Sequence, residues 1–280
     1  TLGSLPDFQA AIAALDAAIA AAGPILGSEP GPRLTPAALS RLDFVEIVGL
    51  CDSNRAAAEA LAKRFNIGKV AATLAELVDV APNVVYVLTP PASHATLAMA
   101  AMDMGCHVLV EKPMADTAAD CEAMLAKSRA TGLKLGVNHS DLFDPVLMRA
   151  LDAAKNGDIG DVLSVDIVRN SEYPPYAGGP LPGMVTQGSY PFRDLGVHGL
   201  YTIEAFIGAL SQVDVRYQSR GTDPNLGFDE WQAQAQSATG VGMRSRFRRR
   251  CRRRPSSRHR RRSCRGVLSR RRRLWWLRRL

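Results

Sequence analysis

Asp194 and His198 are polar residues four positions apart in a stretch whose pattern is apolar and helical. Side chains at this spacing share one face of a helix, so both could point into the same cleft. Hydride removal from a carbinol carbon needs a base for the hydroxyl proton, and histidine titrates nearest to neutral pH. His198 is therefore a candidate base, while an ordinary surface pair of polar residues is the alternative.

Lys112 is the second candidate for chemistry, in the tripeptide Glu111-Lys112-Pro113 that follows the apolar run HVLV. Its ammonium group could hydrogen-bond the oxygen that loses its proton and stabilise the developing negative charge. Asp194 would then orient the imidazole of His198 or bind a neighbouring hydroxyl. Taken alone, Lys112 could equally be a solvated loop lysine.

The elements that must position these residues alternate, from residue 44 onward, between short apolar runs and longer helical segments. This alternation is typical of parallel strands joined by crossover helices. Strands are predicted at 44–50, 83–88, 107–110 and 133–137, with a weaker one at 69–72. Helices are predicted at 53–65, 73–78, 94–104 and 117–129. The series predicts a Rossmann-like, doubly wound sheet that binds its ligand beyond the carboxyl ends of the strands.

Asp52 follows the first predicted strand, where a carboxylate can accept hydrogen bonds from an adenosine ribose and repel a 2′-phosphate. With Ser53 beside it, this position favours NAD over NADP as the cofactor, while a helix N-cap is the alternative. The glycine loop expected earlier is irregular, because Gly23 and Gly27 do not have the G-x-G-x-x-G spacing. These glycines are candidate phosphate contacts or simply parts of a loop, in an irregular region over residues 1–43.

Further candidates for cofactor binding stand at the same predicted sheet edge. They include Thr89, Pro90 and His94 after one strand, Glu111 with Lys112 after the next, and Asn138 at the end of a third. Asn138 could instead cap its strand, and His94 could be a plain residue at the start of a helix.

The pattern changes after Asn138. A helix at 145–155, a strand at 162–168, a helix at 193–207 and alternating runs at 213–219 and 228–237 predict an α+β domain that begins an antiparallel sheet. Tyr173 and Tyr176, in a loop rich in proline and glycine, could line a substrate pocket or pack on the sheet. We therefore expect a dinucleotide-binding domain over 1–138, a substrate and oligomerisation domain over 139–243, and a tail over 244–280.

Two segments of the chain resemble the Gfo/Idh/MocA oxidoreductases, the family of glucose-fructose oxidoreductase and inositol dehydrogenase. TPPASHATLAMAAMDMGCHVLVEKP is similar to the family segment that ends at the active-site lysine, and Asp194-Leu-Gly-Val-His198 resembles its D-x-G-x-H. The resemblance implies an NAD(P)-dependent oxidoreductase, a homo-oligomer when intact, that acts on a hydroxyl or carbonyl carbon of a sugar or polyol. Lys112, Asp194 and His198 would be its catalytic and substrate-binding residues. Tyr201 departs from the family, in which many members have a second aspartate.

The positive charge of the chain is concentrated at one end. Residues 244–280 hold 19 arginines with no lysine, aspartate or glutamate, so the remainder carries 16 basic and 27 acidic side chains although the whole chain is +8. The acidic remainder gives no reason to expect a nucleic-acid partner. A segment so rich in arginine is typical of a GC-rich gene translated out of frame, and a basic arm that binds nucleic acid is the alternative. We expect a disordered tail and a sheet cut short after Gly242, with 228–237 at its edge.

Other features of the sequence limit the class of protein. Five cysteines without metal-ligand spacing favour unpaired thiols in a reducing compartment and no metal site. No apolar stretch approaches the roughly 20 residues of a membrane helix, and the first 25 residues lack the basic start of a signal peptide. We expect a cytoplasmic protein without a membrane partner. A non-catalytic ligand sensor on the same fold is the alternative function.

Overall fold

The computed structural model of the chain describes residues 39–40, 42, 44–171, 192–219, 228, 230–237 and 241–249. The chain divides into two compact units, residues 1–149 and 150–280. The division falls inside helix α6 (Pro145–Lys155), later than the boundary at residue 138 that the sequence pattern suggests. Among the described residues, no helix is both long and apolar enough to cross a membrane, and no three potential metal ligands gather.

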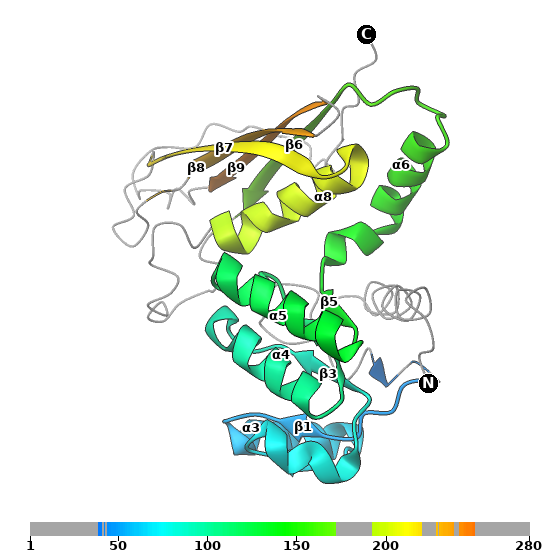
Figure 1. The fold of residues 1–280 in the computed structure, drawn as a ribbon, viewed down its shortest axis with the longest axis vertical. Helices are drawn as coiled ribbons and strands as arrows, with labels where there is room; N and C mark the ends of the chain where they lie inside the picture. The colour runs from blue at the N-terminus through cyan, green and yellow to red at the C-terminus, as the bar shows by residue number, and fades with distance from the viewer. Residues whose placement is uncertain are drawn as a thin grey trace, which may run out of the picture. The chain divides into compact units, whose positions relative to one another are not determined.

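The first unit is a parallel α/β fold, which confirms the predicted class (Figure 1). Strand β1 (Leu50–Cys51) pairs with β2 (Val70–Ala71), and β4 (His107–Val110) lies between β3 (Val84–Val87) and β5 (Leu135–Val137), all in parallel. The intervening helices are α3 (Arg55–Phe65), α4 (His94–Asp103) and α5 (Ala118–Thr131). Shorter helical turns are η1 (Leu74–Val80), η2 (Pro91–Ser93) and η3 (Ser140–Phe143).

These strands form two sheets that no described strand joins. In a doubly wound sheet of order 3-2-1-4-5-6, the first strand lies between the second and the fourth. β1 and β3 have the places of the second and fourth strands, and residues 1–38, which precede them, are outside the described part of the chain. Of the strand predicted at 44–50, only the last residue, Leu50, lies in a strand, and it forms β1 together with Cys51. Phe44, the first residue of the prediction, is 63% exposed.

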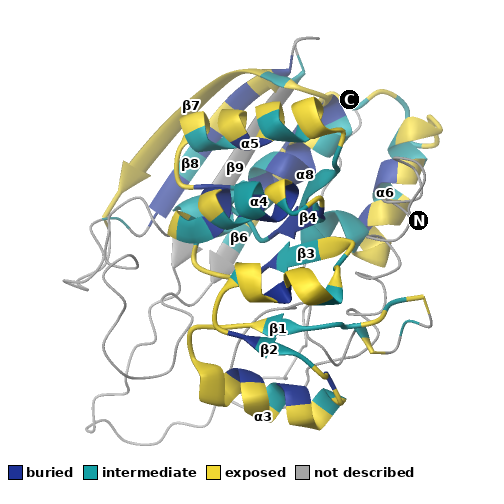
Figure 2. Ribbon diagram, turned by 60° about the horizontal axis from the view of Figure 1, so that its bottom comes forward, coloured by how far each residue is buried: buried dark blue, intermediate teal, exposed yellow. Residues whose placement is uncertain are grey.

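The core of the first unit is centred on β4, whose last three residues are buried. Ala98 and Ala101 of α4 are fully buried, and such small side chains let the helix lie close to the sheet. Met102 of α4 and Met124 of α5 fill the space around them. Helix α3 lies further out and shows only a narrow buried stripe, at Ala58 and Ala62 (Figure 2).

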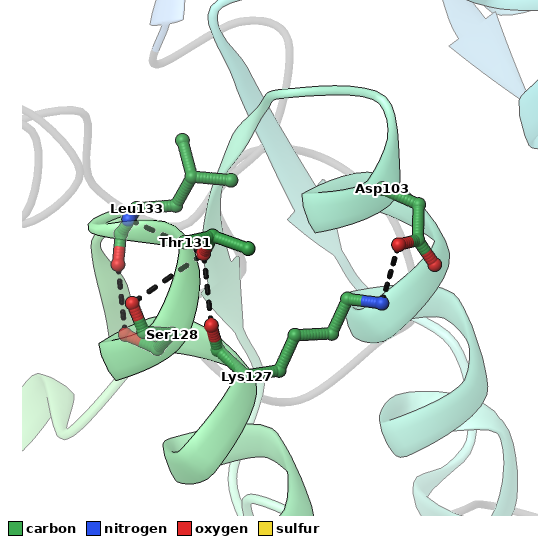
Figure 3. A network of polar contacts seen from close by, with 5 residues as sticks. All are labelled: Asp103, Lys127, Ser128, Thr131 and Leu133. Carbon is green, nitrogen blue, oxygen red and sulfur yellow. Dashed lines mark hydrogen bonds and ion pairs between the residues drawn. The ribbon is translucent and has the colours of Figure 1, made fainter.

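Helix α5 is fixed at both ends. Thr117 is its N-cap, since its Oγ1 accepts a hydrogen bond from Asp120 N at 3.1 Å. Near the other end, Lys127 Nζ pairs with Asp103 Oδ1 of α4 at 2.5 Å, and Ser128 Oγ donates to Leu133 O at 2.7 Å (Figure 3). These contacts tie α5 to α4 and to the segment that leads into β5.

The second unit packs one helix against a four-stranded sheet. After β6 (Ser164–Ser171) come the π-helical turn η4 (Phe192–Gly196), α8 (Val197–Ile207), β7 (Leu210–Gln218), β8 (Glu230–Ser237) and β9 (Gly242–Arg249). The sheet order is β6-β9-β8-β7, antiparallel except for the parallel pair β6–β9. α8 covers one face of the sheet, where Ile203 and Ile207 pack with Val165, Ile167 and Ala235 (Figure 1).

The structure corrects the expectation that the sheet is cut short after Gly242. β9 runs to Arg249 and pairs with β6 and β8, so β8 is an interior strand and not an edge. The physical reason lies in the period of the sequence: Met243, Ser245 and Phe247 alternate with arginines, and a two-residue period is what a strand requires. The mostly exposed edge strand is β7 (Figure 2).

Candidate active site

Three polar side chains meet at the carboxyl edge of the sheet β3-β4-β5. The parallel register places the last residues of the strands, Val87, Val110 and Val137, side by side. Just there, Tyr86 Oη donates to Glu111 Oε1 at 2.5 Å, and Asn138 Nδ2 donates to the same oxygen at 2.7 Å. Asn138 Nδ2 also lies 2.8 Å from Tyr86 Oη. We call Tyr86, Glu111 and Asn138 the triad.

The network fixes which way the Asn138 amide faces. The Tyr86 hydroxyl uses its hydrogen on Glu111, so both groups near the Asn138 amide present oxygen atoms that need a donor. The NH2 group must therefore face them, and Oδ1 must face away. Asn138 is only 2% exposed, and its Oδ1 has no hydrogen-bond partner within the described part of the chain. A buried acceptor without a partner costs about 1–3 kcal/mol, so this atom is suited to accept a hydrogen bond from a ligand.

Lys112 follows Glu111, the member of the triad at the end of β4, and is half-buried. Its backbone N–H lies 3.3 Å from Glu111 Oε2, and its peptide bond to Pro113 is cis. The Glu111 carboxylate therefore contacts the main chain of the lysine as well as the side chains of the two neighbouring strands. This arrangement places the start of the lysine side chain at the carboxyl edge of β4.

His94 joins the two loops at this edge. Its ring is fully buried, with Nε2 2.6 Å from Thr89 O and Nδ1 2.9 Å from Pro113 O. α4 begins at His94, as expected, but both ring nitrogens are engaged by the main chain. The sequence suggests that His94 contacts the cofactor directly. In the structure its ring nitrogens face main-chain oxygens instead. The exposed Thr89 and Pro90 stay available at the surface of the same loop.

Asp52 lies at the carboxyl end of β1 and is exposed, as is Ser53. Its Oδ1 accepts a hydrogen bond from Asn54 N at 2.8 Å. The N-cap of α3 is Asn54, whose side chain accepts from Ala57 N at 3.1 Å, and not Asp52 or Ser53. The capping alternative for Asp52 is therefore removed, and its carboxylate stays a candidate for ribose binding.

In the second unit, Asp194 and His198 flank the junction between η4 and α8. Asp194 lies in the π-helical turn, a rare conformation that is frequent at functional sites, and both residues are half-buried. His198 Nδ1 lies 2.5 Å from Tyr201 Oη, and the two rings meet edge to face with centroids 5.4 Å apart. Thr202 Oγ1 donates to His198 O at 2.7 Å.

Gly196 explains the middle of the D-x-G-x-H pattern. A Cβ atom at Gly196 would collide with the ring of Phe192, which lies directly over it. The Phe192 ring in turn stacks on Trp231 of β8, with centroids 6.4 Å apart. Glycine is therefore needed here for close packing, and the packing anchors the turn that carries Asp194 to the sheet.

Some residues singled out in the sequence lie outside the described residues, namely Gly23, Gly27, Tyr173 and Tyr176. Two functional candidates were missed: Tyr86, which lies inside a strand and looks like a packing residue, and Tyr201 as the partner of His198. The spacing of three residues between His198 and Tyr201 on one helix is a signal that could have revealed that pair.

The three described cysteines, Cys51, Cys106 and Cys121, are free thiols, and burial raises the pKa of each of them.

Residues 22–139 match the family described as "Oxidoreductase family, NAD-binding Rossmann fold". D-glucoside 3-dehydrogenase of Escherichia coli (strain K12) is 30% identical over 194 residues, which are 67% of this chain and 55% of that protein. 1,5-anhydro-D-fructose reductase of Ensifer adhaerens is 32% identical over 160 residues, 56% of this chain and 48% of the relative. The chain thus spans about half the length of these relatives.

Among solved structures, GenD2 from gentamicin A biosynthesis, in complex with NAD, superposes with a TM-score of 0.65 at 23% identity. The superposition covers 76% of this chain and 61% of that protein. At this level of identity the likeness shows a common fold, and it includes most of the described residues.

Proposed function

We propose that this chain is a member of the Gfo/Idh/MocA family of NAD-binding oxidoreductases, whose description residues 22–139 match. From this premise we propose that the protein transfers a hydride between a nicotinamide cofactor and a carbon of a sugar or polyol. The observation that carries the proposal is the triad of Tyr86, Glu111 and Asn138 at the carboxyl edge of the parallel sheet, next to Lys112. Ligands of open α/β sheets bind beyond this edge. The named activities of the two relatives, on a glucoside and on an anhydro sugar, support the substrate class.

The residues present fit a dinucleotide. Asn138 Oδ1 is a buried acceptor that lacks a described partner, and the amide of a nicotinamide ring is a donor of the right kind. Asp52, exposed at the end of β1, can accept from the ribose hydroxyls and would repel a 2′-phosphate. We therefore assign NAD over NADP, with Ser53, Thr89 and Pro90 as further contacts.

The chemistry of the protein's own residues follows from their types. NAD, when bound, supplies the acceptor for the hydride. We assign to His198 the removal of the hydroxyl proton, because an imidazole can take a proton at neutral pH. We assign to Lys112 a hydrogen bond to the same oxygen, whose negative charge grows as its proton leaves. Asp194 binds a neighbouring hydroxyl of the substrate, because the Nδ1 atom of His198 is already engaged by Tyr201.

The test measures NAD binding by fluorescence titration and turnover with a panel of sugars and polyols by nicotinamide absorbance. Lys112→Ala and His198→Ala should each lower kcat by about 10²- to 10⁴-fold, while the Kd for NAD changes little. Matched controls are Lys69→Ala, which removes a lysine paired with Asp79 at 2.7 Å, and His107→Ala, at the amino end of β4.

The controls should retain the parent's turnover. Turnover by either Lys112→Ala or His198→Ala within threefold of the parent would remove that residue from the mechanism. Binding of NAD without turnover of any member of the panel would favour the ligand-sensor alternative.

A further inference from the structure

We propose that Tyr201 is the positioning residue of His198, which it holds in the tautomer whose Nε2 atom is the reacting nitrogen. The role of Nε2 as the reacting nitrogen rests on the proposed function, whereas the contact between Tyr201 and His198 does not depend on it. The carrying observation is the pairing of Tyr201 Oη with His198 Nδ1 at 2.5 Å. A tyrosine here is also where this chain departs from the family pattern.

The contact is formed within one helix, α8. Both residues lie on α8, three positions apart, so they share one face of the helix. The rings meet edge to face at an interplanar angle of 62°, which directs one ring nitrogen of His198 at the hydroxyl and not at the ring face. Thr202 Oγ1 donates to the carbonyl oxygen of His198, which adds a second contact to the same helical turn.

Burial makes the contact restrictive. Tyr201 is only 5% exposed, and Thr202 and Ile203 beside it are buried as well. A buried phenol seeks a hydrogen-bond partner, because leaving its oxygen without one carries a desolvation cost. The His198 ring therefore cannot rotate about its Cβ–Cγ bond without breaking a short hydrogen bond inside the packed face of α8. This restriction selects one orientation of the imidazole.

The orientation decides which nitrogen reacts. The distance between His198 Nδ1 and Tyr201 Oη fits a hydrogen bond in either direction. We assign Nδ1–H as the donor, because the base of the proposed function needs its lone pair on Nε2, and the hydrogen bond made by one ring nitrogen sets the protonation of the other. In the oxidation, the substrate O–H proton goes to Nε2, the carbon gives its hydrogen with the bonding electron pair to the nicotinamide, and the C–O bond becomes a carbonyl. When Nε2 takes the proton, the Nδ1–H···O bond becomes charge-assisted and stronger. Tyr201 thereby favours the proton-accepting step without contacting the substrate.

The experiment compares Tyr201→Phe with the parent in the full chain. Phe keeps the ring in the buried site and removes only the hydroxyl group. Nitrogen-15 NMR of the histidine side chains, above the pH at which the imidazole titrates, reports which nitrogen carries the hydrogen. The signal of His198 is identified by its loss in His198→Gln, since the chain has five histidines.

The parent should show the Nδ1–H tautomer at His198, and Tyr201→Phe should show a mixture of tautomers. In kinetics, kcat should fall by about tenfold, the value of one hydrogen bond, while the KM for NAD is unchanged. The matched control is Tyr217→Phe. Tyr217 lies in β7, is 57% exposed and contacts the ring of Phe228. This control should leave both measurements as in the parent.

Three outcomes would overturn the inference: an Nε2–H tautomer in the parent, an unchanged tautomer in Tyr201→Phe, or a kcat of Tyr201→Phe equal to that of the parent. A chain that binds NAD and turns over none of the panel would contradict the proposed function instead. The NMR comparison would still decide the contact in that case, so the two failures are distinguishable.

Discussion

Replacing His94 by alanine should separate the loop after β3 from the loop after β4. The change removes two contacts, from Nε2 to Thr89 O at 2.6 Å and from Nδ1 to Pro113 O at 2.9 Å. A neutral imidazole carries one N–H, so only one of these contacts to a carbonyl oxygen is a hydrogen bond, and its net contribution is about 0.5–1.5 kcal/mol. The lost ring leaves a cavity at a fully buried position, which adds a cost of about 1–2 kcal/mol.

We therefore expect the free energy of unfolding to fall by about 1.5–3.5 kcal/mol, and Tm to fall by roughly 5–10 °C. The functional effect comes from Pro113, because it follows Lys112 directly. A lysine displaced by a fraction of an ångström should reduce kcat by about 10- to 100-fold at a temperature where the variant is fully folded. Thermal unfolding followed by circular dichroism and steady-state kinetics measure the two effects.

His107→Ala is the matched control for this prediction. His107 also contacts the main chain, but at the amino end of β4, where its Nδ1 accepts a hydrogen bond from Lys134 N at 3.0 Å. It should destabilise the protein by about 1 kcal/mol and leave kcat unchanged. The reasoning is refuted if His94→Ala has the parent's kcat at full folding, or if the two variants lower kcat equally.

Three further predictions address other parts of the chain. Asp52→Ala should reduce the preference for NAD over NADP by about tenfold, the scale of a charged hydrogen bond, in parallel fluorescence titrations; an unchanged preference would exclude Asp52 from ribose binding. Gly196→Ala should lower the free energy of unfolding by about 1–3 kcal/mol, because the Phe192 ring must move, and a Tm equal to the parent's would contradict that packing. A chain that ends at Arg249 should keep hydrogen-exchange protection in β6 and β8, whereas one that ends at Val241 lacks the strand between them and should lose the protection of β6, while β8 keeps its pairing with β7. Equal protection in the two truncations would show that β9 is dispensable.

The sequence by itself determined the parallel α/β class of the first unit and most of its elements. Continuous apolar runs at 83–88 and 107–110 predict buried strands, and β3 and β4 lie within or at them. The reason is that a strand covered on both faces must be apolar at every position, which leaves a pattern independent of the rest of the chain. The position of Lys112 at the carboxyl edge follows from the same pattern.

The contents of the site were decided only by the tertiary structure. Tyr86, Glu111 and Asn138 are far apart in sequence, and their contacts depend on the register of three strands, which no local pattern encodes. Likewise, His94 looks in sequence like a helix residue near a cofactor, whereas the fold turns its ring between two loop carbonyls. The arginine-rich residues of β9 were misjudged because we considered their composition and not their two-residue period, while the partners of the strand, β6 and β8, were decided by the tertiary structure. Side-chain periodicity is a property of one segment, but a hydrogen bond between strands or loops is a property of how the chain brings distant segments together.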